Sequence, residues 1–176
     1  MPVWDRVSDP VRRPERPQFM PPKYDYRRRL PHIQKDNRPI FITFTTDHRW
    51  ELPSEARNIV LECCLKENGI KFDLHTVVVV PDHAHLLLSP LRATDGWNLS
   101  LPQIMHAIKG ASARKINLLL NRRDPVWQEE FFDHVLRSND SLAEKADYIR
   151  QNPVRAGLVK AEGEYPWLWR ETIPIL

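Results

Sequence analysis

Residues 77–89 read VVVVPDHAHLLLS, so two apolar segments lie on either side of a Pro-Asp dipeptide. Short apolar runs that are rich in branched side chains predict buried strands, here Phe72 to Val80 and His83 to Ser89. Strands that are joined by only two residues pair antiparallel. We therefore expect a central hairpin, whose second strand lies in the interior of a sheet and carries two histidines.

The remaining segments predict an α+β fold. Along the chain the order is a strand, a helix, the two hairpin strands, a helix, a short strand or loop, and a last helix. Clustered antiparallel strands favour a sheet with the helices on one face. The last helix should end by Asn152, because proline disfavours helical backbone in the residue before it. The predicted ranges are 39–46 for the first strand, 54–68, 102–121 and 141–152 for the helices, 127–136 for a short aromatic segment, and an extended tail with Tyr165, Trp167 and Trp169.

Composition excludes several classes of protein. The chain has 176 residues, of which 41% are hydrophobic and 28% are charged, as in a globular domain. No apolar run approaches the ~20 residues of a membrane helix, and the N-terminus lacks the apolar segment of a secretory signal. The only cysteines, Cys63 and Cys64, are adjacent, which excludes a disulfide framework and a thiolate zinc site. We expect a reducing, cytoplasmic location.

Positive charge is concentrated near the N-terminus. Residues 1–40 contain ten Lys or Arg, five Asp or Glu, and eight of the sixteen prolines. Proline removes backbone donors and fixes φ, so this segment cannot form long helices or central strands. We predict a basic arm at residues 1–38, extended or disordered, that precedes a single domain at 39–176. The arm is either a solvated tail or a phosphate-contacting segment, and composition leaves both open.

Two histidines occupy alternate positions of the second hairpin strand. Side chains at i and i+2 of a strand point to the same face, so His83 and His85 project together from a rigid platform. Two imidazoles at this spacing can bind one metal ion, and a pair that only satisfies hydrogen bonds is the alternative. Leu87 and Leu88 argue against the HxHxH and HxHxDH patterns of histidine-triad nucleotide hydrolases and metallo-β-lactamase-like hydrolases.

A tyrosine and an asparagine lie one turn apart on the predicted last helix. Tyr148 and Asn152 have i, i+4 spacing, so their side chains share a face. A positioned tyrosine oxygen can attack phosphorus as a covalent nucleophile. The Asn152 oxygen could complete a His-His-Asn site, which suits Mg²⁺ or Mn²⁺. The alternative is an amphipathic-helix tyrosine followed by an asparagine that caps the helix.

Three blocks of sequence together resemble the IS200-like single-tyrosine transposases of the HUH endonuclease superfamily, and most closely the REP-associated tyrosine transposases. VPDHAHLL at residues 80–87 is similar to the family's strand with two histidines. IKGASARKIN at 108–117 is similar to its basic helix. Residues 127–137 and YIRQNP at 148–153 are similar to its C-terminal block, which holds the catalytic tyrosine. Position 82 is Asp where the family more often has Asn.

The resemblance, which covers about residues 39–170, implies a ferredoxin-like fold with the HUH motif on the central strand. It implies a divalent metal, Mg²⁺ or Mn²⁺, bound by His83, His85 and Asn152. It also implies that Tyr148 attacks a phosphodiester of single-stranded DNA, which leaves a 5′-phosphotyrosine and a free 3′-hydroxyl. The implied substrate is hairpin-forming DNA, such as repeated extragenic palindromes. Such a protein would be associated with the nucleoid, and we expect a monomer, with a dimer as the alternative.

DNA-contacting side chains are expected around this site. A single strand needs a positive groove and stacking surfaces, and residues 101–123 contain five basic residues and no acidic one. The predicted contacts are Lys109, Arg114 and Lys115 to the DNA backbone, Arg137 and Arg150 to the scissile phosphate, and Trp127 as a stacking surface.

Two other functions fit the same residues. One is a domesticated protein that binds hairpin DNA and no longer transposes it. The other is a metal-dependent phosphodiesterase that uses water as its nucleophile, forms no covalent adduct and tolerates phenylalanine at position 148.

Overall fold

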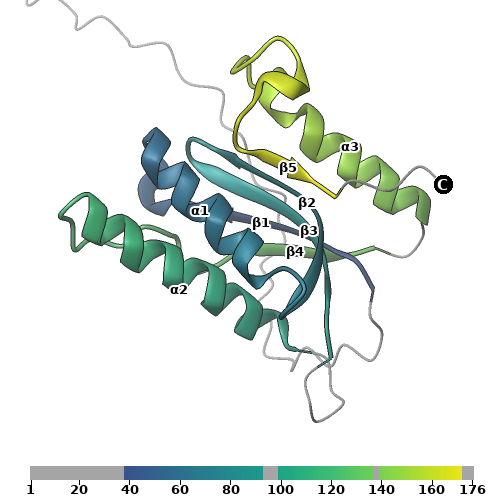
Figure 1. Cartoon of the computed structure of the whole chain (residues 1–176), viewed down its shortest axis with the longest axis horizontal. Coiled ribbons are helices and arrows are strands. Elements are labelled where there is room, and N and C mark those ends of the chain that lie inside the picture. Colours follow the sequence, from purple (N-terminus) through teal and green to yellow (C-terminus); the bar gives the residue numbers. More distant parts are fainter. Residues whose placement is uncertain (1–37, 93–98, 137–138, 172–176) are drawn as a thin grey trace, which may run out of the picture. The chain divides into compact units, whose positions relative to one another are not determined.

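The computed structural model describes residues 38–92, 99–136 and 139–171 (Figure 1). These residues form an α+β fold with the order of strands and helices that the sequence predicts. The predicted arm, apart from Arg38, lies outside the described residues, and so does the predicted phosphate contact Arg137. The predictions for these residues therefore remain predictions.

The described strands form one antiparallel sheet in the order β4-β1-β3-β2-β5. The middle strand is β3 (His83–Pro90), which pairs with β1 (Ile40–Thr45) on one side and β2 (Phe72–Val80) on the other. The edges are β4 (Phe132–Val135) and β5 (Leu168–Arg170). The strand with the two histidines is therefore central, and the tail with the tryptophans pairs as an edge strand.

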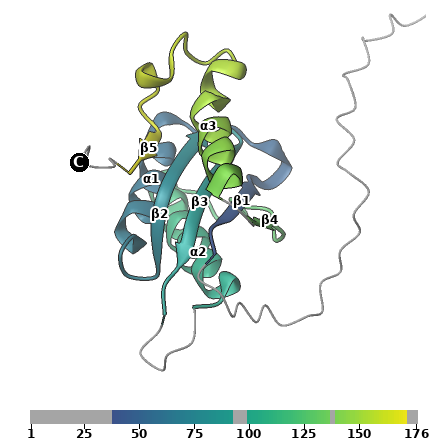
Figure 2. The ribbon, with the colours of Figure 1, turned by 90° about the vertical axis from the view of Figure 1, so that its right-hand side faces the viewer.

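Helices cover both faces of the sheet. On one face lie α1 (Ser54–Glu67) and α2 (Leu101–Leu119), and on the other lies α3 (Asn139–Arg155), as Figure 2 shows from the α3 side. Two short 3₁₀ turns, η1 (Asp47–Arg49) and η2 (Glu162–Glu164), follow β1 and α3.

The placement of α3 corrects one prediction. The antiparallel α+β class is confirmed, but the prediction that the helices lie on one face is wrong for α3. The reason lies in the hairpin strands, which are apolar toward both faces. Val77 and Val79 pack toward α1 and α2, whereas Val78 and Val80 pack toward α3. Both faces must be removed from water, so each needs its own helical cover.

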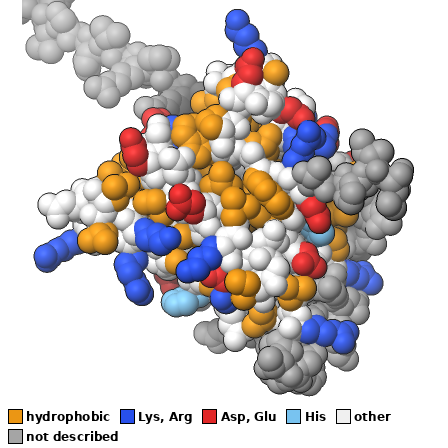
Figure 3. All heavy atoms as spheres, viewed as in Figure 1, with side chains coloured by type: hydrophobic (Ala, Val, Ile, Leu, Met, Phe, Trp, Pro, Cys, Tyr) orange, Lys and Arg blue, Asp and Glu red, His pale blue; other side chains and the backbone are white. Residues whose placement is uncertain are grey.

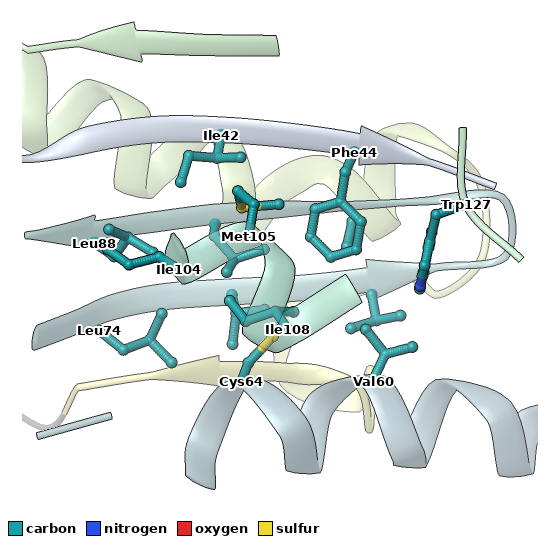
Figure 4. Close-up of a cluster of buried hydrophobic side chains, with 14 of the residues drawn as sticks. Ile42, Phe44, Val60, Cys64, Leu74, Leu88, Ile104, Met105, Ile108 and Trp127 are labelled. Atoms are coloured by element: carbon teal, nitrogen blue, oxygen red, sulfur yellow. The ribbon is translucent and has the colours of Figure 1, made fainter. Parts of the chain in front are cut away.

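The larger core lies between the sheet and the two helices α1 and α2 (Figure 4). Alternate side chains of β1 and β3 point into it, because side-chain direction alternates along a strand. The two cysteines belong to α1 and are buried, so they act as packing groups, and burial raises the pKa of both thiols. Side chains that make up this core include Ile42, Phe44, Val60, Cys64, Leu74, Leu88, Ile104, Met105, Ile108 and Trp127.

The last helix runs further than the sequence predicts. α3 continues through Pro153 and ends at Arg155, three residues after the expected end at Asn152. Proline lacks a backbone N–H and so cannot donate to the carbonyl of Ile149, four residues earlier. Backbone bonds from Ala156 to Asn152 and from Leu158 to Pro153 hold the turn that follows.

No helix in the described residues has both the length and the apolar composition needed to cross a membrane.

Candidate functional site

The two histidines of β3 face each other on the α3 side of the sheet. Ala84, between them, belongs to the opposite core, as strand alternation requires. The Nε2 atoms of His83 and His85 are 3.1 Å apart, and the ring centroids are 4.7 Å apart. His83 is half-buried and His85 is buried. The structure thus brings together the pair that the sequence singled out.

An aspartate and an arginine hold the outer side of His83. Its Nδ1 donates to Asp82 Oδ1 at 2.6 Å, and Arg49 Nη1 donates to Asp82 Oδ2 at 3.0 Å. The hydrogen bond from His83, together with Arg49, lowers the pKa of Asp82 to about 2. Asp82 is therefore an anion that can only accept at neutral pH, so His83 Nδ1 carries the proton of this hydrogen bond and Nε2 is the nitrogen that faces His85.

The turn η1 brings Arg49 to this position. Its residues His48 and Arg49 have φ values of 49° and 58°, in the left-handed region that costs energy for residues other than glycine. Thr46, just before the turn, donates from its backbone N–H and from its hydroxyl to the carbonyl of Asp82, each at 2.9 Å. The end of β1 therefore anchors the turn between β2 and β3.

A threonine of β1 holds the outer side of His85. Thr43 is the register partner of His85 across the β1-β3 pair, and its Oγ1 lies 2.8 Å from His85 Nδ1. A hydroxyl can donate or accept here. If it donates, the proton of His85 is on Nε2, which faces His83; if it accepts, the Nε2 lone pair of His85 is free. Thr43 thus fits both the metal-free and the metal-bound proton arrangement of His85.

His85 is electrically neutral at physiological pH. Burial, followed in size by the charge of His83, lowers the pKa of His85 to about 3. A neutral imidazole is the form that binds metal ions. The arrangement of the two histidines is therefore suited to metal binding without prior loss of a proton from His85.

The predicted nucleophile lies beside this pair. The ring of Tyr148 is 5.6 Å from the ring of His85 and 6.0 Å from that of Phe41, both measured between centroids. Phe41 in turn stacks on His85 at 5.5 Å with an interplanar angle of 25°. β1, β3 and α3 each contribute one ring, and Tyr148 remains half-buried with part of its surface open to solvent.

One face of α3 carries further polar groups next to Tyr148. Lys145, Tyr148, Asn152 and Arg155 have the spacing i, i+3, i+7 and i+10, which confines them to an arc of roughly 80°. Lys145 Nζ lies 5.6 Å from the centroid of the Tyr148 ring, and Arg155 Cζ lies 5.4 Å from it. Two cations therefore flank the phenol, where an anionic phosphate would be attracted.

The residues present fit a divalent metal. Asn152 Oδ1 is buried and has no hydrogen-bond partner, although buried oxygens in folded proteins are normally paired. Mn²⁺ and Mg²⁺ accept amide oxygen together with imidazole nitrogen. In the described part of the chain, no three His, Cys, Asp or Glu side chains form a metal-binding group. The amide oxygen of Asn152 is a donor of another kind.

Two of the predicted DNA contacts make hydrogen bonds within the protein. Trp127 is only 7% exposed, and its indole N–H donates to Ser112 at 3.0 Å, so the structure does not support it as a stacking surface for bases. Lys109 Nζ donates to the carbonyls of Gln128 and Glu129 at 2.7 and 2.8 Å. Lys109 therefore ties α2 to the segment before β4, and its contact with DNA stays a prediction.

The other predicted basic contacts are not gathered at one place. Arg114 and Lys115 are exposed on α2, on the face of the sheet opposite to the histidines, and Lys and Arg side chains lie over α2 in Figure 3. Arg150 pairs with Asp147 at 2.6 Å and with Glu162 at 3.4 Å. DNA binding by these three residues stays a prediction.

Sequence reasoning did not find several residues of the site. Lys145 could have been found within the predicted helix, one turn before Tyr148, and Arg155 by extending the same helical spacing beyond Pro153. Thr43 and Arg49 carry no local signal, since their roles arise from strand register and from the turn η1.

Comparison with known proteins gives a consistent result. A family model described as "Transposase IS200 like" matches residues 40–152. Two curated relatives, from Haemophilus influenzae and Escherichia coli, both have names that include "REP-associated tyrosine transposase". Each is 26% identical to this chain, over 101 and 96 residues, and the matches cover 54% of this chain. The chain spans about half the length of the curated relatives it matches, 57% and 53% respectively.

Solved structures share the fold. One is a REP-associated tyrosine transposase bound to a REP hairpin, with a TM-score of 0.60, 22% identity, and coverage of 75% of this chain and 76% of that one. Another is a bacterial tRNA(His) guanylyltransferase-like protein in complex with GTP, with a TM-score of 0.51 and 13% identity, covering 73% of this chain and 67% of that one. At these identities the likeness concerns the fold alone.

Proposed function

The chain belongs to the IS200-like transposase family, and from this premise we propose that it cuts and rejoins single-stranded DNA next to hairpins through a tyrosine intermediate. The observation that carries the proposal is the position of the Tyr148 ring, 5.6 Å from the ring of His85, whose Nε2 faces that of His83. The names of the curated relatives support REP-type hairpin DNA as the substrate.

In the proposed reaction, the phenolic oxygen of Tyr148 loses its proton to water and attacks the scissile phosphorus. The bond from phosphorus to the 3′ oxygen breaks, and that oxygen takes up a proton. The products are a 5′-phosphotyrosine and a free 3′-hydroxyl. The phosphodiester is exchanged for another ester, so attack by a different 3′-hydroxyl can reverse the step and join two strands.

Several residues of the chain would prepare this step. Lys145 and Arg155 would attract the phosphate to the phenol from either side. A divalent Mg²⁺ or Mn²⁺ held by His83, His85 and Asn152 would act as a Lewis acid on the phosphate oxygens. Asp82 and Thr43, at the outer nitrogens of the two histidines, would keep these ligands in orientation.

Tyr148 is proposed to act together with the histidine pair of its own chain. Tyr148 contacts His85 and Phe41 of the same chain, so the arrangement needs no second copy. This supports the expectation of a monomer, and the oligomeric state is open to measurement by light scattering.

A covalent-trapping experiment tests the proposal. The full-length protein is mixed with Mn²⁺ and a pool of single-stranded hairpin oligonucleotides from the source genome, and products are analysed on denaturing gels and by mass spectrometry. We expect a metal-dependent adduct on Tyr148 that is abolished completely in Tyr148→Phe. The matched control Tyr165→Phe also removes one phenolic hydroxyl, which donates to the carbonyl of Val79, and it should retain the adduct.

The other outcomes identify the alternative functions. Cleavage without an adduct, retained in Tyr148→Phe, would establish a phosphodiesterase that uses water. Hairpin binding with neither cleavage nor adduct, at a metal concentration that loads the site, would establish a DNA-binding protein without this chemistry.

A further inference from the structure

A phenylalanine of the edge strand β4 is exposed beside the candidate site. Phe132 has 57% of its surface exposed, although burial of an aromatic ring is normally favourable. The preceding residue, Phe131, is packed against the larger core on the other face of the sheet, with Lys109 Nζ 5.6 Å from its ring. The two adjacent phenylalanines therefore differ, because Phe131 is half-buried whereas Phe132 is exposed.

Strand register puts Phe132 in the same cross-strand row as the metal-ligand candidates. Phe132 is the partner of Thr43 in the β1-β4 pair, and Thr43 is the partner of His85 in the β1-β3 pair. Directly opposed residues in antiparallel strands point to the same face. With neighbouring strands about 4.8 Å apart, Phe132 lies roughly 10 Å from His85 across the sheet.

Aromatic contacts connect the exposed ring to the site. The ring of Phe132 is 6.4 Å from that of Phe41, edge to face. Phe41 contacts both His85 and Tyr148, as described above, and Lys145 Nζ lies 5.1 Å from the centroid of its ring. A ring that is supported from one side by another ring, exposed on the other, and part of an aromatic cluster that a cation contacts has the features of a stacking surface for single-stranded nucleic acid.

We propose that Phe132 forms a nucleobase subsite, on which a base of the single strand next to the scissile phosphate stacks. The inference rests on the proposed function. It assigns to Phe132 the stacking role for which the buried Trp127 is unsuited. Stacking is tolerant of base identity, because every base has a flat face, so the subsite would position the strand and would not read its sequence.

Abasic scanning tests the subsite. The probe is a source-genome hairpin bound in the trapping experiment, with oligo-dT tails on both sides, in which one thymidine at a time is replaced by an abasic residue. For the wild type we expect one tail position where base removal weakens binding by about 5- to 150-fold. Phe132→Leu should bind the intact probe weaker by a similar factor and should lose sensitivity at that position. Phe132→Tyr, which keeps a flat ring, should behave as the wild type.

The control and the contradicting results separate stacking from a structural role. Val135 is also exposed, at 37%, but its register partner is Ile40 of the opposite core, so Val135→Ala should change nothing. If Phe132→Leu keeps the abasic sensitivity of the wild type, so that it weakens binding of the probe that lacks this base as much as binding of the intact probe, the subsite is refuted. The same holds if Phe132→Leu changes the oligomeric state, which would make β4 an interface between copies. If the wild type binds no hairpin, the proposed function itself fails, and the subsite fails with it.

Discussion

The two faces of β3 serve different purposes although they alternate residue by residue. Ala84, Leu86 and Leu88 point to the larger core under α1 and α2, and each is fully buried. His83 and His85 point to the α3 face, where their ring nitrogens meet a carboxylate, a hydroxyl and each other. The same strand therefore supplies apolar packing on one side and an array of polar ligands on the other.

This difference shows how the fold makes a rigid site. A packed core resists movement of the strand that crosses it, so imidazoles on its other face keep their spacing. The α3 face also has a hydrophobic cluster, which includes Phe41, Val78, Leu87 and Ile149. His85 and Tyr148 contact that cluster through the ring of Phe41.

Shortening a side chain of the core face should have the largest effect on stability. Leu86→Ala removes a fully buried side chain, and we expect the free energy of unfolding to fall by about 2–5 kcal/mol in chemical denaturation. The matched control Leu118→Ala alters a side chain that is 83% exposed and should change it by less than about 0.5 kcal/mol. Equal stability of both variants would contradict the assignment of this face as the core.

Removing the hydroxyl behind His85 should affect the other face selectively. Thr43→Val keeps the shape of the side chain but loses the contact to His85 Nδ1, so we expect Mn²⁺ affinity to fall by about 10- to 100-fold. The measurement is titration of the full-length protein followed by the electron paramagnetic resonance of free Mn²⁺. This readout needs no DNA and no catalysis.

Two further variants sharpen this test. Thr43→Ser retains the hydroxyl and should restore most of the Mn²⁺ affinity. Thr45→Val changes the next threonine on the same face of β1, opposite His83, and should leave the affinity unchanged. An unaltered affinity in Thr43→Val would show that strand packing alone orients His85.

The smallest effect is expected for the basic side chains of α2. If Arg114 and Lys115 contact phosphates, the double variant with glutamine at both positions should reduce the slope of log Kd against log salt by roughly 1.4 to 1.8. Adduct formation at saturating DNA should not change, because α2 and Tyr148 lie on opposite faces of the sheet. The measurement is hairpin binding by fluorescence anisotropy at several salt concentrations.

A control variant distinguishes specific contacts from net charge. Lys66→Gln removes one exposed positive charge from α1 and should leave the slope unchanged. An unchanged slope in the double variant as well would confine the DNA to the α3 face, and the prediction for Arg114 and Lys115 would then be wrong.

Local pattern was sufficient to predict most elements of the fold. β2 begins and ends where the apolar run indicates, and β3 follows after Pro81-Asp82 as expected. The shared direction of His83 and His85 follows from strand alternation, and the pairing of Tyr148 with Asn152 follows from helical spacing. These features depend on residues close in sequence, so they can be inferred without knowledge of the fold.

Other features depend on contacts between distant segments. The aromatic residue Trp127 has the composition of a DNA-stacking group, yet packing against Phe44 at 4.7 Å buries it. Lys109 belongs to a basic helix, yet its ammonium donates hydrogen bonds to backbone carbonyls of another segment. Composition cannot distinguish a buried ring or a paired cation from a free one.

The order of strands and helices, the central hairpin and the candidate ligands on β3 and α3 were thus accessible from the residues themselves, because periodicity expresses the local geometry of the backbone. The face that α3 covers, the contact of Thr43 with His85 and the exposure of Phe132 required the folded chain. Each results from strand register and packing across the sheet, which join residues that are dozens of positions apart in the sequence.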